Sequence, residues 1–219
     1  MSKEARYTAI ILKKQAFNEA DEIITFFTKE AGKVRGLAKS VKSPKSKLQQ
    51  MLQALFVVNI SLAGNKLPQI IVAEAVKVFS GLRENLEALK RAFYAAELIL
   101  KFTPDEQINQ KLFEDLENFL ETLNTEASEE FMDLALVKFK LEALGALGLN
   151  FAHSAEAIGL SKQEKDTLQF VEKNNFPSLR LLKDSGSVKQ LNNLLSAFIE
   201  YQLERRIKSE QYLKNGNMV

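Results

Sequence analysis

The chain has 219 residues, of which 46% are apolar and 26% charged, and its formal net charge is only +2. This composition is typical of a globular protein long enough for one large or two small domains. It contains no cysteine, which excludes disulfides, thiolate zinc sites, iron-sulfur clusters and cysteine nucleophiles. Because no apolar run is long enough for a signal peptide or a membrane span, we expect a cytoplasmic protein.

The first part of the chain has the pattern of a small β-barrel. Five short runs rich in β-branched and aromatic residues lie within residues 7–79, separated by turn residues such as Gly32 and Gly64. A stretch with helical spacing, residues 43–53, separates the third run from the fourth. Five strands cannot easily bury both faces as a flat sheet. Because five strands with a short helix in this place is the OB-fold layout, we predict an OB-fold over residues 1–80.

After residue 80 the apolar residues recur every three or four positions, which predicts α-helices. The predicted helices cover residues 86–100, 112–123, 131–144, a shorter helix from about 162, and a long final helix over 188–213. A capping box from Ser161 to Glu164 opens the fourth helix. The chain is therefore predicted to be an α+β protein of two domains, with residues 81–219 forming an all-helical second domain.

The near-neutral net charge hides a separation between the two domains. Residues 1–80 hold thirteen basic and six acidic residues, net +7, whereas residues 81–219 hold seventeen and twenty-two, net −5. Six basic residues fall within positions 33–47, and no acidic residue occurs between Ala31 and Ala73. An uncompensated basic run concentrates positive potential for a polyanion. A solvated, lysine-rich loop is the plainer interpretation of the same run.

In an OB-fold, the second and third strands carry the face that binds single-stranded nucleic acid. No aromatic residue lies between Phe27 and Phe56, so the run lacks a stacking platform and we expect contacts mainly to the phosphate backbone. Six phosphate contacts would give a salt slope of roughly −4 to −5. Such binding leaves base edges free, so two complementary strands could pair without an ATPase.

We find no pattern that predicts catalysis or metal binding. His153 is the only histidine, so no two-histidine metal motif can form. The glycine-containing stretch over residues 32–40 lacks the contiguous glycine, lysine and hydroxyl residue of a phosphate-binding loop. Because the serines near this stretch have no neighbouring base, acyl transfer is not expected. We expect a binding protein that is not an enzyme and needs no cofactor.

Three stretches resemble the RecO family of bacterial recombination mediators. They read AIILKKQAFNEADEIITFFTKEAGKVRGLAKSVKSPKSKL in the barrel, LPQIIVAEAVKVFSGLRENLEALKRAFYAAELI at the domain junction, and YQLERRIKSEQYL near the end. The first stretch is the most specific. The resemblance covers nearly the whole chain and implies an OB-fold followed by a helical domain.

The resemblance also implies a function. A RecO-like protein would bind single- and double-stranded DNA and anneal complementary strands. With RecR, it would help to load RecA recombinase onto DNA coated with single-stranded-DNA-binding protein, in a bacterial cytoplasm and in association with the nucleoid. Carried onto this chain, the DNA-binding residues would be Lys33, Arg35, Lys39, Lys42, Lys45 and Lys47.

The chain departs from the family at one place. Many members carry a four-cysteine zinc motif after the third helix, but the corresponding stretch LGLNFAHSAEAIGLSK has no cysteine. We therefore expect a zinc-less variant in which apolar residues hold this loop, with Leu149, Phe151 and Ile158 as candidates.

The resemblance further implies that the helical domain docks the acidic tail of single-stranded-DNA-binding protein. Such a tail needs an apolar pocket with a basic rim. The candidates for that rim are Arg83, Lys90 and Arg91, or Lys138 and Lys140. A basic cluster near the C-terminus is either compensation of a helix dipole or a second DNA contact. This cluster consists of Arg205, Arg206 and Lys208.

Two other functions fit the same residues. A groove that reads the backbone does not distinguish DNA from RNA, so an RNA-binding OB-fold protein of RNA metabolism is one alternative. A structural adaptor that acts through its helical domain is the other, and in that protein the basic run would be incidental.

Overall fold

The structure is a computed structural model that describes residues 4–43, 46–149, 151, 159–182 and 186–214. It divides into two compact units. The first, called the barrel unit below, comprises Met1–Phe79 together with Thr103–Phe113. The second, the helical unit, comprises Ser80–Phe102 and Glu114–Val219. No helix in the described ranges has the length and apolar character needed to cross a membrane.

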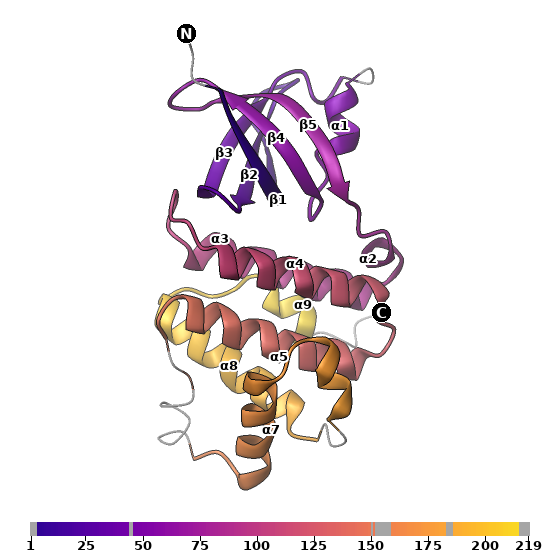
Figure 1. The fold of residues 1–219 in the computed structure, drawn as a ribbon, viewed down its shortest axis with the longest axis vertical. Coiled ribbons are helices and arrows are strands. Elements are labelled where there is room, and N and C mark those ends of the chain that lie inside the picture. The colour runs from indigo at the N-terminus through magenta and orange to yellow at the C-terminus, as the bar shows by residue number, and fades with distance from the viewer. Residues whose placement is uncertain (1–3, 44–45, 150, 152–158, 183–185, 215–219) are drawn as a thin grey trace. The chain divides into compact units, whose positions relative to one another are not determined.

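Five strands form a closed barrel in the order β1-β2-β3-β5-β4 (Figure 1). Their bounds are β1 Glu4–Ala16, β2 Glu22–Thr28, β3 Gly32–Ala38, β4 Val57–Ala63 and β5 Gln69–Lys77, and the short helix α1 spans Lys47–Met51 between β3 and β4. Neighbouring strands are antiparallel except β3 and β5, which meet in parallel at Leu37 and Gln69. This strand order, with the helix in that place, confirms the predicted OB-fold.

Strand alternation fills the barrel with one set of side chains and leaves the other set outside. The buried core includes Ile11, Ile24, Phe26 and Ile60. On β3, Val34 packs against this core, so the alternating positions 33 and 35 face outward. The sequence pattern therefore places the first two basic residues of the run on the outer surface of the barrel.

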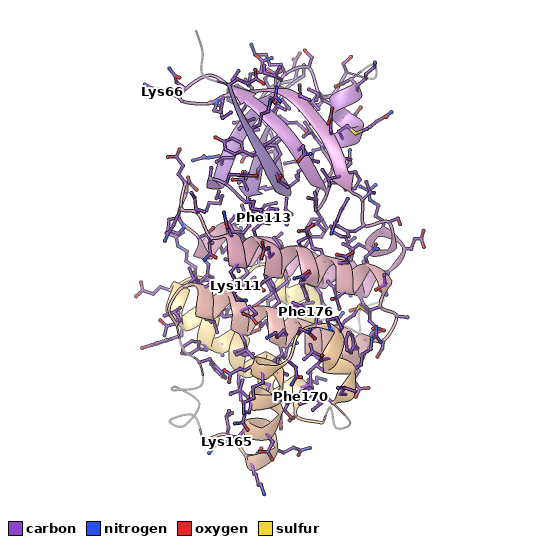
Figure 2. All side chains as sticks on the ribbon, in the orientation of Figure 1. Lys66, Lys111, Phe113, Lys165, Phe170 and Phe176 are labelled. Atoms are coloured by element: carbon purple, nitrogen blue, oxygen red, sulfur yellow. The ribbon has the colours of Figure 1, made fainter. Side chains whose placement is uncertain are left out.

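The segment Thr103–Phe113 lies outside the predicted barrel boundaries yet belongs to the barrel unit. Phe27 alternates with the core residue Phe26 and therefore needs cover on the outer side of β2. Phe113, labelled in Figure 2, supplies that cover, with its ring centroid 6.0 Å from that of Phe27, and both side chains are almost completely buried. We predicted that residues 81–219 form the helical domain, whereas in the structure Thr103–Phe113 belongs to the barrel unit.

In the described residues, the helical unit contains helices at all the places that the apolar spacing predicts, and three short ones besides. The predicted places hold α3 Leu86–Phe102, α4 Gln110–Thr125, α5 Glu129–Ala146, α7 Lys162–Lys173 and α8 Val188–Leu203. The short helices that were not predicted as separate elements are α2 Gly81–Glu84, the 3-10 helix η1 Pro177–Leu181 and α9 Glu210–Lys214. The first four residues of α4 belong to the barrel unit. The capping box is confirmed: the Ser161 amide donates to Glu164 Oε2 at 2.7 Å, and the Glu164 amide donates to Ser161 Oγ at 3.3 Å. α5 ends beside Gly148, whose φ of +74° favours glycine.

The prediction of one long final helix over residues 188–213 is wrong. α8 ends at Leu203 because Glu204 adopts a left-handed conformation with φ 51°. Side chains elsewhere satisfy the backbone amides of the turn that follows. Glu200 accepts from the Ile207 amide at 3.0 Å, and Glu97 accepts from the Lys208 and Ser209 amides at 2.9 and 2.7 Å. These bonds stabilise a turn between α8 and α9 that apolar spacing cannot reveal.

Candidate nucleic-acid interface

The basic run of the sequence extends along β3 and past its end. Lys33 is the second residue of the strand and Arg35 the fourth, whereas Lys39 directly follows the end of the strand. At about 3.3 Å per residue, Lys33 and Lys39 are roughly 20 Å apart along the strand. The run is therefore long enough to follow several phosphates of an extended strand.

Lys33 is largely enclosed by the barrel unit itself. Its side chain is only 11% exposed, and its Nζ donates to the Thr103 carbonyl at 2.7 Å and lies 3.2 Å from Asp105 Oδ1. The backbone pairs as well, because Lys33 and Asp105 form a parallel bridge and the Glu106 amide donates to the Lys33 carbonyl at 3.0 Å. Lys33 thus holds the segment Thr103–Phe113 against β3.

Arg35 remains accessible. Its side chain is 62% exposed, and its Nη2 lies 3.2 Å from Asp105 Oδ2. The two carboxylate oxygens of Asp105 therefore contact two of the predicted DNA-binding residues. Of that pair, Arg35 is the one that solvent can reach.

Lys39 and Lys42 lie on the loop after β3, which is tied to the loop between β1 and β2. The Ser40 amide donates to Asp21 Oδ1 at 2.7 Å, and Lys42 Nζ donates to the Asn18 carbonyl at 2.9 Å. The hydrogen bond from Ser40 is the main cause that lowers the pKa of Asp21, with help from Asn18. The first loop is one of those that OB-folds use for binding, so these bonds position both lysines beside it.

The remaining basic residues of the run are exposed or outside the described part. Lys47 is exposed at the first position of α1. Lys45 lies outside the described residues. Lys66, which sequence reasoning did not select, is exposed on the loop between β4 and β5 (Figure 2). Lys66 could have been selected from the sequence, because it lies in the loop between the fourth and fifth strands, which OB-folds commonly use to bind nucleic acid.

A cleft of about 470 Å³ joins the start of β3 to the β4–β5 loop. Its lining includes Lys33, Arg35 and Lys66, together with Tyr7 and the acidic pair Asp105 and Glu106. Basic groups from separate segments therefore converge on one concave surface. The same surface also carries two carboxylates from Thr103–Phe113.

The expectation of a basic run without nearby carboxylates holds along the sequence but fails in space. Asp105 contacts Lys33 and Arg35, and Asp21 lies close enough to Lys39 and Lys42 for their charges to lower its pKa further. Folding brings these carboxylates from outside the run. The positive potential of this face is consequently smaller than the residue count suggests.

The C-terminal basic cluster lies in the turn after α8. Arg205, Arg206 and Lys208 are all exposed, and they follow a helix that has already ended. Because the cluster begins two residues after the end of α8, its charges can still compensate the dipole of that helix. Their exposure also fits a second DNA contact, and both interpretations stay predictions.

Most of the cations proposed as the rim of a peptide pocket are internal. Arg91 is 5% exposed and its Nη2 lies 2.8 Å from Asp133, so it links α3 to α5. Lys140 is 1% exposed, donates to Ser196 Oγ at 2.7 Å and lies 4.7 Å from the centre of the buried Tyr94 ring. Lys138 is 5% exposed and ion-pairs with Glu142 on the same helix. These three side chains stabilise the helical unit.

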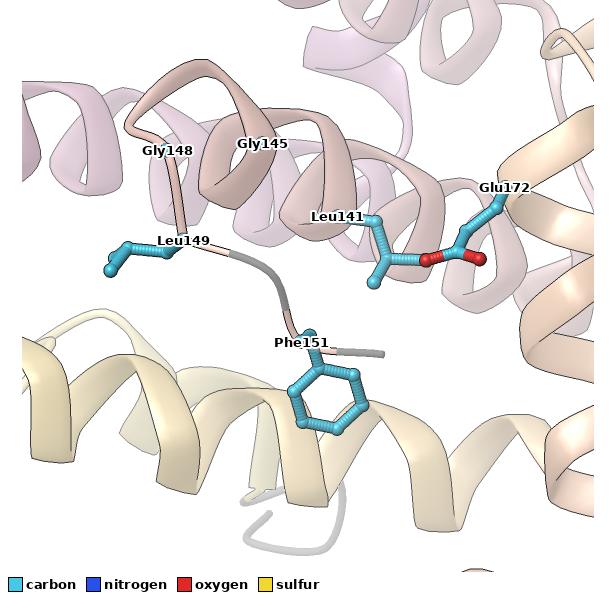
Figure 3. A pocket seen from close by; sticks show the side chains of 6 residues that line it. All are labelled: Leu141, Gly145, Gly148, Leu149, Phe151 and Glu172. Atoms are coloured by element: carbon cyan, nitrogen blue, oxygen red, sulfur yellow. The ribbon is translucent and has the colours of Figure 1, made fainter. Parts of the chain in front are cut away.

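Two of the three apolar residues expected to hold the loop after α5 are among the described residues. Phe151 is buried against Phe198, with ring centroids 5.3 Å apart, and Leu149 is half-buried; Ile158 lies outside the described residues. Leu149 and Phe151 line a pocket of about 370 Å³ (Figure 3). Burial raises the pKa of Glu172 in this pocket. None of the described residues that line it is basic, so it is poorly suited to an acidic peptide.

A second pocket of the helical unit has a basic group at its rim. It measures about 280 Å³, and its lining combines the apolar residues Phe131, Leu134, Leu179 and Leu182 with Ser128, the acidic Glu130 and the basic Arg180. The Arg180 guanidinium lies 4.4 Å from the centre of the Phe131 ring and 2.6 Å from Glu126. Sequence reasoning missed Arg180 because its 3-10 helix has no apolar periodicity.

Two family models match most of the chain. Family models described as "Recombination protein O N terminal" and "Recombination protein O C terminal" match residues 1–79 and 83–158. The chain is similar to the DNA repair protein RecO of Synechocystis sp., at 32% identity over 89% of this chain and 74% of the relative. It is also similar to the RecO of Dehalococcoides mccartyi strain CBDB1, at 28% identity over 94% of this chain and 93% of the relative.

Proposed function

Because the chain belongs to the RecO family of DNA repair proteins, we propose that it is a non-enzymatic recombination mediator that binds DNA through its barrel unit and anneals complementary strands. The observation that carries the proposal is the placement of exposed basic groups along β3 and its adjoining loops, on an OB-fold. Four of them, Lys39, Lys42, Lys47 and Lys66, are exposed side chains outside the contact with Asp105.

The proposed binding mode is contact with phosphates. Lysines on loops make point-charge contacts that do not depend on base identity. The outward surface of β3 between these loops presents Arg35 and Leu37, neither of which is a stacking aromatic. A strand held in this way keeps its base edges free, so pairing with a complementary strand supplies the free energy of annealing, at about 1.4 kcal/mol per base-pair step.

The structure changes the expected number of contacts. Lys33 is engaged within the barrel unit, so it contributes mainly to folding. With Lys45, which stays a predicted contact, the four exposed lysines make five contacts and predict a salt slope for single-stranded DNA of about −3.5, compared with the steeper value expected for six contacts. Arg35 would add one further contact if phosphate displaced Asp105 from it.

The helical unit is proposed to dock protein partners. In this role the protein would cooperate with RecR to load RecA and would bind the acidic tail of single-stranded-DNA-binding protein. The pocket beside Arg180 supports tail docking better than the pocket beside Glu172, because it combines an apolar lining with a guanidinium group, although Glu130 in its lining and Glu126 beside Arg180 reduce the positive charge there. We further propose Arg205, Arg206 and Lys208 as a second DNA contact.

The test is equilibrium binding of the full chain to labelled single-stranded DNA, followed by fluorescence anisotropy over a range of salt concentrations. We expect a log-log slope of about −3.5 and weak dependence on base sequence. RNA of the same sequence is the discriminating competitor. A clear preference for RNA would favour an RNA-binding protein, and absence of binding to both nucleic acids would favour a structural adaptor.

A further inference from the structure

The acidic residue Asp105 occupies the place on Arg35 that a DNA phosphate would take. Its Oδ2 lies 3.2 Å from Arg35 Nη2, and its Oδ1 lies 3.2 Å from Lys33 Nζ. A carboxylate that bridges two cations uses the charge and the geometry by which a phosphate oxygen would bind them. Asp105 is 54% exposed, so this competition takes place at the surface, within reach of a ligand.

The backbone around Asp105 is fixed by contacts that do not involve its carboxylate. The Glu106 amide donates to the Lys33 carbonyl, and Lys33 Nζ donates to the Thr103 carbonyl. Phe113 is buried against Phe27 at the far end of the same segment. A phosphate therefore needs to displace only the Asp105 side chain from Arg35, while the segment stays on the barrel.

The two cations differ in how easily a phosphate can reach them. Lys33 is 11% exposed and has a second bond, to the Thr103 carbonyl, that does not involve Asp105. Arg35 is 62% exposed, and its planar guanidinium can reorient toward a phosphate. Displacement of Asp105 would therefore release Arg35 and leave Lys33 in its structural role.

We propose that Asp105 competes with DNA for Arg35. It pairs with Arg35 in the absence of ligand, and a phosphate displaces it from Arg35 when a strand binds. The result is a lower affinity than the basic face would otherwise have. A mediator that passes strands on to other proteins would benefit from such a weakened contact. This inference rests on the proposed DNA binding and names a residue that tunes it.

The test compares Asp105→Asn with Glu106→Gln, using labelled oligothymidine and the full chain. Both substitutions remove one negative charge from the same segment and the same cleft, but only Asp105 contacts Arg35. We expect Asp105→Asn to tighten binding about two- to fivefold beyond the control, as the loss of a surface ion pair allows. The salt slope should change by much less than the roughly 0.7 of one phosphate contact, because Arg35 contacts a phosphate in both complexes and only the competing ion pair with Asp105 is removed.

Asp105→Asn in an Arg35→Ala background completes a double-mutant cycle for these two residues. There the gain from Asp105→Asn should shrink to that of Glu106→Gln. Equal effects of the two single substitutions, or a gain that persists without Arg35, would overturn the inference. Loss of the folded state in Asp105→Asn, seen by circular dichroism, would also overturn it, because Asp105 would then be a structural residue. If the unmodified chain does not bind the oligonucleotide, the proposed function itself fails.

Discussion

Gly32 lies directly against the backbone of Gln107. A Cβ atom built on Gly32 would lie 2.1 Å from the Gln107 carbonyl oxygen, and φ of Gly32 is +69°. Both facts require glycine, because the contact is to backbone and the conformation is left-handed. The turn between β2 and β3 therefore depends on the segment that also carries Asp105.

Replacing Gly32 by alanine should destabilise the protein by more than about 2 kcal/mol, because the strain of a left-handed alanine, roughly 1–2 kcal/mol, adds to the backbone clash. Gly148→Ala is the matched control, with φ +74° and no atom within 4 Å of the added Cβ. Calorimetric unfolding of the two variants measures the difference. Equal losses of stability would mean that the Gln107 contact costs nothing.

The turn between α8 and α9 should depend on pH through Glu97. Burial opposes ionisation of this carboxylate, but hydrogen bonds from Lys101, Ser209 and the Lys208 amide lower its pKa to about 2. Because the pKa is lower in the folded state, the ionised Glu97 stabilises that state at any pH above its ordinary pKa of 4.5. This contribution is lost as the pH falls from 4.5 toward 2. Glu97→Gln should therefore cost about 2 kcal/mol at neutral pH.

The measurement is the free energy of unfolding of both proteins between pH 7 and pH 2.5. The difference between them should be constant above pH 5 and should shrink below pH 4.5. Titrations common to both proteins cancel in this difference. A cost that does not change with pH would show that the Glu97 charge is not what stabilises the turn.

Arg91 should behave as a core residue of the helical unit. It is 5% exposed and bonds to Glu87 and Asp133, so Arg91→Met leaves both carboxylates without their buried partner. We expect a loss of about 3 kcal/mol in urea unfolding. Lys90→Met removes the other cation that pairs with Glu87, but the Lys90 side chain is 18% exposed compared with 6% for Arg91, so the loss should be smaller. A stable Arg91→Met protein that had lost only peptide binding would restore Arg91 as a rim residue.

Much of the fold was predictable because it depends on local patterns. Alternating apolar residues predicted the five strands, helical spacing predicted the main helices, and Ser161 with Glu164 marked a helix start. The missed features depend on contacts distant in sequence. Neither the return of Asp105 and Phe113 to the barrel nor the turn held by Glu97 leaves a periodic signal. The basic run was evident in the sequence, but the division between an internal Lys33 and an accessible Arg35 was not.

The most direct test of the account is ATP-independent annealing of two complementary oligonucleotides by the full chain. Lys39→Glu with Lys42→Glu reverses two charges beside the barrel loops, and Lys162→Glu with Lys165→Glu makes the same change on the exposed face of α7. The account predicts annealing by the unmodified chain, its loss in the first variant, and its retention in the second. Equal annealing by both folded variants would contradict the claim that the barrel surface binds the DNA.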